Sequence, residues 1–349
     1  MNDTRSVLLT SAASGVGRAV QQASTLSARD YRFVCISSTS EITNRGENTL
    51  PCPPTAERAA FQARTLQLAE TMGVCLVVPG RDEDAAALAA VASDLQVRGA
   101  MLASGPSQPV LAAYDKAATA TALGACGLPI AATAEDVAGA VEIADAHGWP
   151  LVLKPRRGNS SRGVRLVWSE EGLHASFRTE SDIAQEYLAV SPEDRRSWDG
   201  RFPGGQDGEY SLQLLLDCHG REIGHFCSRN TLANGVPLLV ETIAEGQVGD
   251  LLRQACAALG SLSAWGAWNL QGRRSLDGAI RVFEVNARPT GITGLRAWLG
   301  FNELDLLYDA LILGHVTSRP KPIQPGLLID VASFTALEAD GHCRTLPAS

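Results

Sequence analysis

The N-terminal third of the chain alternates short apolar runs with alanine-rich stretches, and this alternation limits the possible folds more than any other feature. The runs lie at residues 6–10, 33–37, 74–78 and 100–103, with a helix-length segment between successive runs. Strands joined by helices pair in parallel, because each connection must return to the starting end of the sheet. We therefore predict a Rossmann-like α/β domain over residues 1–113.

The turn after the first run begins like a dinucleotide-binding fingerprint. Gly15 and Gly17 are present, but Val20 stands where the third glycine is expected. A tight strand-to-helix turn requires the same two glycines, and we favour that interpretation. An oxidoreductase with a nicotinamide cofactor at this turn remains an alternative function.

The pattern changes from Tyr114 onward. Two helices are expected at residues 115–126 and 136–147, followed by a strand at 151–154 and a glycine-rich turn. We place a second domain at residues 114–188.

A third domain is predicted at residues 189–349, where the apolar runs are longer and follow one another directly. The runs lie at residues 209–216, 223–229, 266–273 and 280–285. Such runs favour antiparallel pairing in an α+β body. Apolar residues at helical spacing predict a covering helix over 247–262, and proline and glycine predict a long loop over 190–207.

The composition of the chain argues against several classes of function, because it bears on charge, membrane insertion and disulfide bonding. The chain has 349 residues, 45% of them hydrophobic, and a net charge of −8. It has no basic run, so nucleic acid is not an expected partner. No apolar stretch approaches the length of a membrane span, and the eight scattered cysteines suggest buried reduced thiols. We expect a cytoplasmic globular protein.

A turn rich in glycine and serine follows the strand that ends at Lys154. The turn contains Gly158, Ser160, Ser161 and Gly163. Its backbone N–H groups can surround phosphate oxygens, since glycine permits close approach. The lysine ammonium supplies a compact positive charge for the same phosphates. Taken alone, the pattern also suits an ordinary solvent-exposed turn.

A second group of polar residues is symmetric about Asp277-Gly278, a dipeptide typical of two-residue hairpin turns. Such a turn would place Gln271 opposite Glu284 and Asn269 opposite Asn286. Side chains two residues apart on a strand share a face, so these oxygen atoms would gather on one side of the sheet. Carboxylate and amide oxygens suit Mg²⁺, which would also bind nucleotide phosphate.

A third pattern is an extended segment that could bind a purine base. Backbone groups around Gln185-Glu186-Tyr187-Leu188 could bind the edge of an adenine, and the carboxylate of Glu209 could accept hydrogen bonds from ribose. By itself this pattern is weak.

Taken in order, these residues resemble the ATP-grasp superfamily, and within it the ATP-binding half-domains of the carbamoyl phosphate synthetase large chain. The matching segments are Asp115-Lys116, Gly127-Leu128-Pro129, Lys154-Pro155, residues 158–164, 185–188 and 208–211, Asn269, Gln271 and residues 284–291. The resemblance implies a Rossmann-like domain followed by a two-part ATP-grasp fold. Ala287 departs from the family pattern, where proline is frequent, and the loop at 190–207 is longer than usual.

The resemblance also implies individual roles. Lys116 and Lys154 would bind phosphates, and Arg288 would contact the transferred phosphoryl group, with residues 290–293 beside the acyl phosphate. The other nucleotide-binding residues would be Gly158, Ser160, Ser161, Gly163, Gln185, Glu186, Tyr187, Leu188 and Glu209. The ligands of Mg²⁺ or Mn²⁺ would be Gln271, Glu284 and Asn286. Arg229 and Arg296 are our candidates for binding the substrate carboxylate.

The predicted function is an ATP-dependent ligase that activates a carboxylate as an acyl phosphate and joins it to an amine. Its partners would be two small molecules, and the sequence leaves monomer and homodimer open. Two alternatives remain besides the oxidoreductase: carboxyphosphate or carbamoyl-type transfer, and a module that binds ATP without turning it over.

Overall fold

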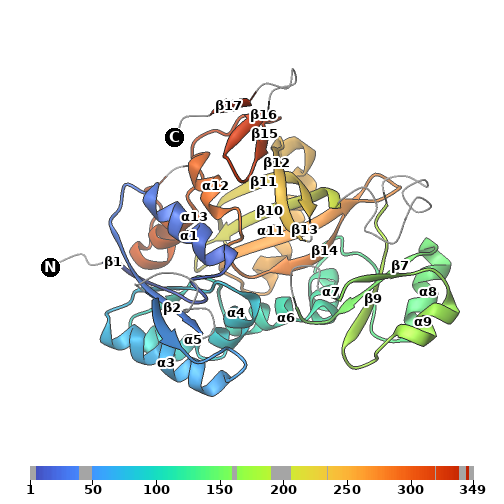
Figure 1. Cartoon of the computed structure of the whole chain (residues 1–349), viewed down its shortest axis with the longest axis horizontal. Coiled ribbons are helices and arrows are strands. Elements are labelled where there is room, and N and C mark those ends of the chain that lie inside the picture. The colour runs from blue at the N-terminus through green and yellow to red at the C-terminus, as the bar shows by residue number, and fades with distance from the viewer. Residues whose placement is uncertain are drawn as a thin grey trace.

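The structure of the chain is a computed structural model. It describes residues 5–38, 49–158, 163–189, 206–233, 235–318, 320–337 and 343–345. Three β-sheets organise these residues, and Figure 1 shows them as three units that meet at the centre of the molecule. Within the described ranges, no helix combines the length and apolar character needed to cross a bilayer.

The N-terminal unit is a parallel sheet with strand order β3-β2-β1-β4-β5. Its strands are β1 (Arg5–Leu9), β2 (Tyr31–Ser38), β3 (Thr49–Cys52), β4 (Leu76–Val78) and β5 (Met101–Leu102). Its helices are α1 (Gly15–Thr25), α3 (Arg58–Thr71), α4 (Asp82–Ala89) and α5 (Ala92–Val97). Val7, Leu8 and Leu9 of the central strand are fully buried, which requires helices on both faces. The predicted parallel α/β unit is confirmed.

The glycines after β1 serve the packing of the turn. Helix α1 begins at Gly15, and the Ser14 hydroxyl accepts a hydrogen bond from the backbone N–H of Gly17. A Cβ atom on Gly17 would lie 2.6 Å from the carbonyl oxygen of Ala12. The close approach of helix and turn therefore explains this glycine without a cofactor, in agreement with the favoured interpretation.

The second unit is an antiparallel sheet with strand order β6-β9-β7-β8. Its elements are β6 (Thr133–Ala134), α8 (Val137–His147), β7 (Leu151–Pro155), β8 (Arg165–Val167), α9 (Glu170–Ser176) and β9 (Asp182–Glu186). Leu151, Leu153 and Ala184 on the strands pack with Ala140 of α8 and Leu173 of α9 in a core of their own. Helices α6 (Ser107–Tyr114) and α7 (Lys116–Ala125) connect this unit to the N-terminal sheet (Figure 1).

The third unit is built on the largest sheet, with strand order β14-β13-β10-β11-β12-β15-β16-β17 and antiparallel pairing throughout. Its strands are β10 (Gln206–Leu216), β11 (Glu222–Ala233), β12 (Val236–Thr242), β13 (Gly266–Arg274), β14 (Ile280–Asn286), β15 (Leu328–Asp330), β16 (Thr335–Leu337) and β17 (Cys343–Thr345). Its helices are the 3-10 helix η1 (Glu245–Gln247), α11 (Gly249–Ser261), α12 (Thr293–Trp298), α13 (Glu303–Tyr308) and the π-helix η2 (Asp309–Leu313). The expected α+β body is confirmed. Residues 190–205 of the predicted long loop lie outside the described part.

The two faces of this sheet differ in polarity. Leu212, Leu214 and Leu270 belong to the same buried core as Leu252 and Ala255 of the predicted covering helix, α11. The opposite face carries a row of polar residues paired directly across five neighbouring strands: Glu284, Gln271, Ser211, Ser228 and Thr242. A second row beside it is formed by Asn286, Asn269 and Gln213. Side-chain alternation thus yields one apolar and one polar face.

The cysteines whose side chains are described are all free thiols. Cys35, Cys52 and Cys227 are buried, as expected. Cys218 is exposed, because it lies in the turn between β10 and β11. The expectation that the cysteines are buried is therefore wrong for this residue.

Candidate active site

The hairpin of β13 and β14 aligns the predicted metal ligands. Gln271 lies opposite Glu284 and Asn269 lies opposite Asn286, as predicted. All four side chains belong to the polar face, because residues two apart on a strand point the same way. The register predicted from the sequence is confirmed.

The turn of this hairpin differs from the prediction. Arg274 pairs with Ile280, so the chain reverses over residues 275–279 instead of a two-residue turn. The pairing register shifts between Gln271 and Gly272, and this shift compensates for the longer turn. A Cβ atom on Gly272 would lie 2.8 Å from the carbonyl oxygen of Arg281. A β-bulge at a glycine therefore restores the pairing of the functional residues.

The oxygen atoms on this face suit a hard divalent cation. The Nε2 of Gln271 donates a hydrogen bond to Oε1 of Glu209, 3.2 Å away. The Oδ1 of Asn269 is buried and has no hydrogen-bond partner within the described residues. No group of three His, Cys, Asp or Glu side chains in the described ranges is arranged for a metal ion. One carboxylate with amide oxygens fits Mg²⁺, which keeps several water or phosphate ligands, and does not fit Zn²⁺.

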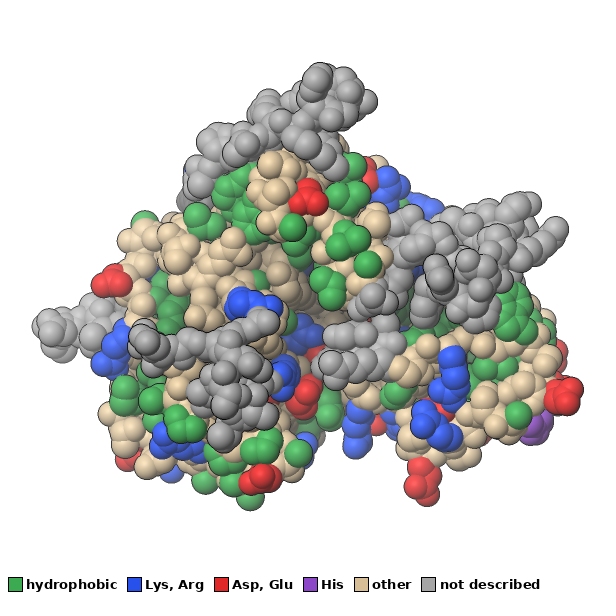
Figure 2. Space-filling view, in the orientation of Figure 1, with side chains coloured by type: hydrophobic (Ala, Val, Ile, Leu, Met, Phe, Trp, Pro, Cys, Tyr) green, Lys and Arg blue, Asp and Glu red, His purple; other side chains and the backbone are tan. Residues whose placement is uncertain are grey.

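Two lysines converge on Glu284, although the whole chain contains only three. The Nζ of Lys116 lies 3.2 Å from Oε1 of Glu284. Lys154 is buried, and its Nζ donates a hydrogen bond to the carbonyl oxygen of Phe283 at 3.0 Å. Figure 2 shows basic and acidic side chains together in the hollow where the units meet. This convergence of opposite charges is the central feature of the site.

The charges shift one another's pKa values. Burial lowers the pKa of Lys154 to about 7, against the attraction of Glu284, and Lys116 lowers it further. Burial alone would raise the pKa of Glu284, but the charges of Lys116 and Lys154 outweigh burial and lower it. Glu284 is therefore ionised at neutral pH, and an incoming phosphate would favour the charged form of Lys154.

Asp115 sets the position of Lys116 at the start of α7. Its carboxylate caps the helix by accepting hydrogen bonds from the N–H groups of Ala117 and Ala118. It also accepts a hydrogen bond from Nε of Arg156, 3.2 Å away. Burial opposes ionisation of Asp115, but Arg156 and the capping bonds lower its pKa. The start of α7 is thus tied to the end of β7.

The glycine-rich turn is described only in part. The carbonyl oxygen of Gly158 accepts a hydrogen bond from Nζ of Lys116 at 2.9 Å. Gly158 and Gly163 have φ angles of 131° and 73°, which favour glycine. Ser160 and Ser161 lie outside the described residues. The Gly158 end of the turn therefore adjoins Lys116, whereas the roles of its two serines stay a prediction.

The segment predicted to contact adenine forms the end of β9. The carboxylate of Glu186 accepts a hydrogen bond from the N–H of Ala132 at 2.9 Å, and its backbone N–H donates to the Ala132 carbonyl oxygen. Nε2 of Gln185 donates to Thr133 Oγ1. These two side chains therefore hold β9 against β6. The nucleotide contacts of Gln185, Glu186, Tyr187 and Leu188 stay predictions, carried by backbone groups.

Glu209 joins the polar face next to Gln271. Burial raises the pKa of this carboxyl to about 7, and Glu284 adds to the rise while Arg273 opposes it. A carboxyl at this position can accept or donate a hydrogen bond near neutral pH. The predicted ribose contact is compatible with this environment.

Arg288 is held by a residue that the sequence did not single out. Its Nη2 donates a hydrogen bond to Oδ2 of Asp82 at 2.5 Å, and its Nη1 donates to the carbonyl oxygen of Pro289. Burial opposes the charge, but Asp82 and Glu284 raise the pKa of Arg288. Asp82 lies just after β4, at the carboxyl end of a parallel strand. That position is a general signal for functional residues in α/β sheets.

The two arginines proposed to bind the substrate carboxylate lie in different places. Arg296 is fully buried beneath the polar face, where Nη1 contacts Gln213 at 3.0 Å and Glu303 at 2.7 Å. Arg229 is half-exposed and pairs with Glu241.

Arg229 points away from the polar face. It lies between Ser228 and Asn230 on β11, and those two side chains hydrogen-bond each other on that face. Strand alternation directs Arg229 to the opposite face. We therefore leave Arg229 out of the site, which corrects its proposed role.

No protein-family model matches the chain. A curated relative is the D-alanine--D-alanine ligase of Streptomyces griseus subsp. griseus, 27% identical over 150 residues. The match covers 43% of this chain and 38% of that ligase. It therefore extends over well under half of either protein.

Solved structures match over almost the whole chain. One is the biotin carboxylase domain of Hydrogenobacter thermophilus 2-oxoglutarate carboxylase with MgADP and bicarbonate. It has a TM-score of 0.66 at 15% identity, covering 93% of this chain and 73% of that chain. Another is carboxyaminoimidazole ribonucleotide synthase from Aspergillus clavatus with ATP, with a TM-score of 0.68 at 16% identity, covering 95% and 82%. The chain has the ATP-grasp fold of these structures. Neither is a carbamoyl phosphate synthetase, so that finer resemblance stays a prediction.

Proposed function

We propose that this chain is an ATP-dependent ligase that joins a carboxylate to an amine through an acyl phosphate, with release of ADP and phosphate. The observation that carries the proposal is the convergence of Lys116 and Lys154 on Glu284, with Arg288 two residues beyond the end of the same strand. Positive groups beside a carboxylate suit a site where a nucleotide phosphate and a metal ion share one space.

The comparisons support this reaction class. The curated relative is named as a ligase, and the synthase of known structure was crystallised with ATP. The biotin carboxylase domain holds MgADP. A shared fold alone does not define a reaction, so the charged site supplies the specific argument.

In the proposed first step, an oxygen of the substrate carboxylate attacks the terminal phosphorus of ATP. A new O–P bond forms, the bond between that phosphorus and its bridging oxygen breaks, and ADP leaves with the electron pair. Lys116 and Lys154 offset the negative charge of the phosphates. Arg288, held by Asp82, is suited to stabilise the phosphoryl group during transfer.

A divalent ion would be held by Glu284, Asn286 and Gln271, whose oxygens match the preference of Mg²⁺. When bound, it would neutralise phosphate charge and orient the nucleotide. The hydrogen bond from Gln271 to Glu209 leaves the amide oxygen of Gln271 available for this purpose.

In the proposed second step, the amine nitrogen attacks the acyl carbon. The C–N bond forms, the bond from carbon to the phosphate oxygen breaks, phosphate leaves with the electron pair, and the amine loses a proton to solvent. The mixed anhydride must be protected from water until the amine attacks. Lys154 is buried and only 11% of the Arg288 side chain is exposed, which is consistent with a site shielded from bulk water.

A second candidate is activation of bicarbonate to carboxyphosphate, followed by carboxyl or carbamoyl transfer. The specific observation in its favour is the bicarbonate bound in the biotin carboxylase domain. It would use the same lysines and Arg288, and would differ only in the acid that is activated.

The decisive experiment measures ADP and phosphate release from MgATP with pools of carboxylates and amines, and identifies the products by mass. We expect acid-dependent ADP formation and a product whose mass equals both substrates minus water. Glu284→Gln should abolish turnover, because it removes the carboxylate for the metal ion. Glu70→Gln, at an exposed position of α3, is the matched control and should retain turnover.

Each alternative predicts a different result. Turnover that requires bicarbonate would favour carboxyphosphate chemistry. Binding of ATP without ADP formation in any pool would favour a binding module and contradict the ligase proposal. Quenching of nicotinamide fluorescence without ATP binding would favour an oxidoreductase.

A further inference from the structure

One arginine on the polar face of the largest sheet has no role in the reaction proposed above. Arg273 lies on β13, two residues beyond Gln271, and both side chains belong to the polar face because residues two apart on a strand point the same way. The Arg273 side chain is partly exposed. It forms no hydrogen bond and no ion pair with another residue in the ranges that the structure describes. A charged planar group on this face is therefore available to a ligand.

A second arginine lies directly opposite the first. Arg281 of β14 pairs with Arg273 across the hairpin. Like charges in directly opposite positions of paired strands destabilise a sheet. The charge of Arg281 is balanced, because its Nη atoms donate hydrogen bonds to Asp277 at 3.0 and 2.6 Å and its Nε lies 3.6 Å from Oε1 of Glu186. The charge left unpaired at this position is that of Arg273.

The neighbour of Arg273 on the other side is the carboxylate proposed to bind ribose. Tyr210 pairs with Gly272, so Glu209 is the residue of β10 that lies beside Arg273. Glu209 is buried, and the positive charge of Arg273 opposes the rise of its pKa. Arg273 thus lies between the proposed ribose contact and Arg281, which contacts the segment proposed to bind adenine.

The proposed phosphate and metal positions lie in the next row of the same face. Gln271 is two residues from Arg273 on β13, about 7 Å along the strand. Glu284, opposite Gln271, contacts the ammonium of Lys116. A nucleotide with its phosphates at Glu284 and its ribose at Glu209 would therefore extend across the face toward Arg273.

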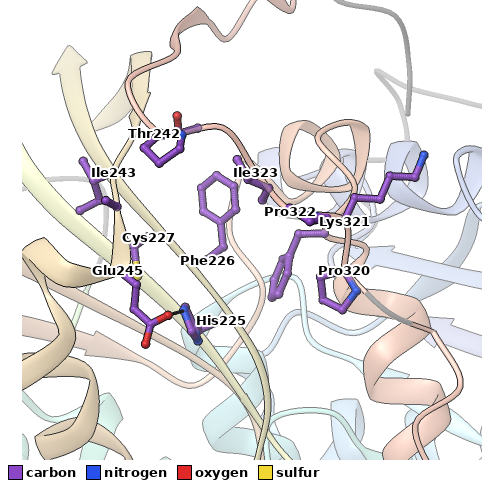
Figure 3. A pocket seen from close by; sticks show the side chains of 13 residues that line it. His225, Phe226, Cys227, Thr242, Ile243, Glu245, Pro320, Lys321, Pro322 and Ile323 are labelled. Carbon is purple, nitrogen blue, oxygen red and sulfur yellow. Dashed lines mark ion pairs between the residues drawn. The ribbon is translucent and has the colours of Figure 1, made fainter.

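A cavity elsewhere in the sheet does not take part in this site. It has a volume of about 290 Å³ and lies between β11 and residues 320–325 (Figure 3). Phe226, Phe301 and Thr242 line it, and none of the residues proposed to bind ATP does. A base near Glu209 would therefore lie on the polar face itself, in contact with the side chains that this face presents.

A guanidinium is suited to the face of a purine ring. It is planar and more weakly hydrated than an ammonium, so it stacks on aromatic rings and is attracted by their π electrons. Nucleic-acid-binding proteins stack unpaired bases on arginine side chains in the same way. Such a stack binds any purine, because every base has a π face, and the choice of base is left to hydrogen bonds at the ring edge.

We propose that Arg273 binds the base of ATP by stacking its guanidinium on the face of the purine ring, while backbone groups of residues 185–188 bind the ring edge. This inference rests on the proposed function, because it adds a residue to the same nucleotide site. A role limited to balancing the charge of Glu209 would be met equally well by a lysine. The experiment therefore separates the planar group from its charge.

The test compares ATP with inorganic tripolyphosphate, which carries the phosphates but no base. Isothermal titration calorimetry with Mg²⁺, in the absence of acid and amine, measures both affinities without turnover. Arg273→Gln should weaken the binding of ATP by about tenfold, because the stack is lost. Its affinity for tripolyphosphate should stay within about twofold of that of the control, since both variants lose one positive charge. The retained binding of tripolyphosphate also shows that the variant is folded.

Arg274→Gln is the matched control. Arg274 is the next residue of β13 and points to the opposite face, where its Nη2 donates a hydrogen bond to Tyr210 Oη at 3.0 Å. The control removes the same charge and should bind ATP with nearly native affinity. Equal losses for ATP and tripolyphosphate in Arg273→Gln, or an affinity for ATP equal to that of the control, would overturn the proposal.

Arg273→Lys tests the planar group directly. It keeps a positive charge beside Glu209 but has no planar face, so it should still bind ATP at least about threefold more weakly than the native chain. Native affinity for ATP in this variant would reduce Arg273 to a counter-ion and contradict the stack.

The binding measurements distinguish this inference from the proposed function. A native chain that binds ATP with the expected effect of Arg273→Gln, but forms no ADP with any acid, would contradict the ligase and leave the stack supported. A native chain that binds tripolyphosphate as tightly as ATP would contradict the stack alone. A native chain that binds neither ligand would contradict both.

Discussion

The ammonium of Lys116 lies 3.2 Å from the carboxylate of Glu284, and this contact joins the first residue of α7 to strand β14. Most of the proposed site depends on it, because the contact places a phosphate-binding charge beside a metal ligand. It also lowers the pKa of Glu284 against the effect of burial. Substitutions on either side should therefore affect nucleotide binding more than stability.

Lys116→Met should weaken the binding of MgATP by about 30-fold, which corresponds to about 2 kcal/mol for the loss of a charge-assisted contact. The side chain keeps its length but loses the ammonium that bridges Glu284 and Gly158. Isothermal titration calorimetry measures the change. Lys321→Met removes the remaining lysine outside the site and is the control. If the two variants bound MgATP with equal affinity, Lys116 would not belong to the nucleotide site.

Asp82→Asn should destabilise the protein by about 3 kcal/mol, because it leaves the buried guanidinium of Arg288 without its partner on the N-terminal unit. Turnover should fall as well, since Arg288 is no longer held in place. Urea unfolding followed by circular dichroism measures the first effect. Asp94→Asn, at an exposed position of α5, is the control. A variant as stable as the native chain would show that Asp82 does not fix Arg288.

Gly272→Ala should cost about 1–3 kcal/mol of stability, because its Cβ atom would lie 2.8 Å from a backbone oxygen of Arg281. The strain falls at the β-bulge that sets the register of Gln271, so the Mg²⁺ concentration needed for half-maximal turnover should rise. Gly260→Ala in α11 meets open space and is the control. Native stability and Mg²⁺ dependence in Gly272→Ala would contradict the importance of the bulge.

The pair of His225 and Glu222 should stabilise the fold most at mildly acidic pH. The distance between His225 Nδ1 and Glu222 Oε1 is 2.5 Å, and this bond raises the pKa of His225 and lowers that of Glu222, with Glu245 and Cys256 nearby. The pKa of His225 is raised on folding. Its contribution to the free energy of unfolding is therefore complete below about pH 6.5, and it is lost as the pH rises through the raised pKa of the folded state. The glutamate contribution is lost at the acid end, as pH falls through its lowered pKa.

His225→Gln should therefore lower the melting temperature more at pH 6 than at pH 9. The pair is only half-buried, so the difference should be about 1 kcal/mol or less. Thermal unfolding of both proteins across this range measures it. A constant difference between pH 6 and pH 9 would show that the pair does not titrate as described.

Much of the architecture could be predicted from short-range patterns. The alternating runs of the N-terminal third predicted the parallel sheet, and the longer runs beyond Gln185 predicted the antiparallel one. The symmetry about Asp277-Gly278 predicted the register of Glu284 and Gln271 correctly. The turn itself was predicted wrongly, because a β-bulge at Gly272 compensates for a longer reversal. Hydrogen bonds along the whole hairpin outweigh the preference of one dipeptide.

The two arginines proposed to bind the substrate carboxylate show what sequence patterns cannot predict. Arg229 and Arg296 carry the same chemical group, yet one is exposed beside Glu241 and the other is buried with unpaired atoms. Residue type alone does not distinguish these environments. Burial depends on which distant segments pack over each side chain.

Local sequence thus determined the strands, the helices and the pairing of neighbours in the hairpin, because hydrophobic periodicity and strand alternation act over a few residues. Only the tertiary structure decided that Asp82 would hold Arg288 and that Gln213 and Glu303 would surround Arg296. The contact of Arg288 with Asp82 joins two units, and that of Arg296 with Gln213 joins segments 83 residues apart in the chain. Their geometry follows from the packing of the sheets and helices against one another, which no short segment encodes by itself.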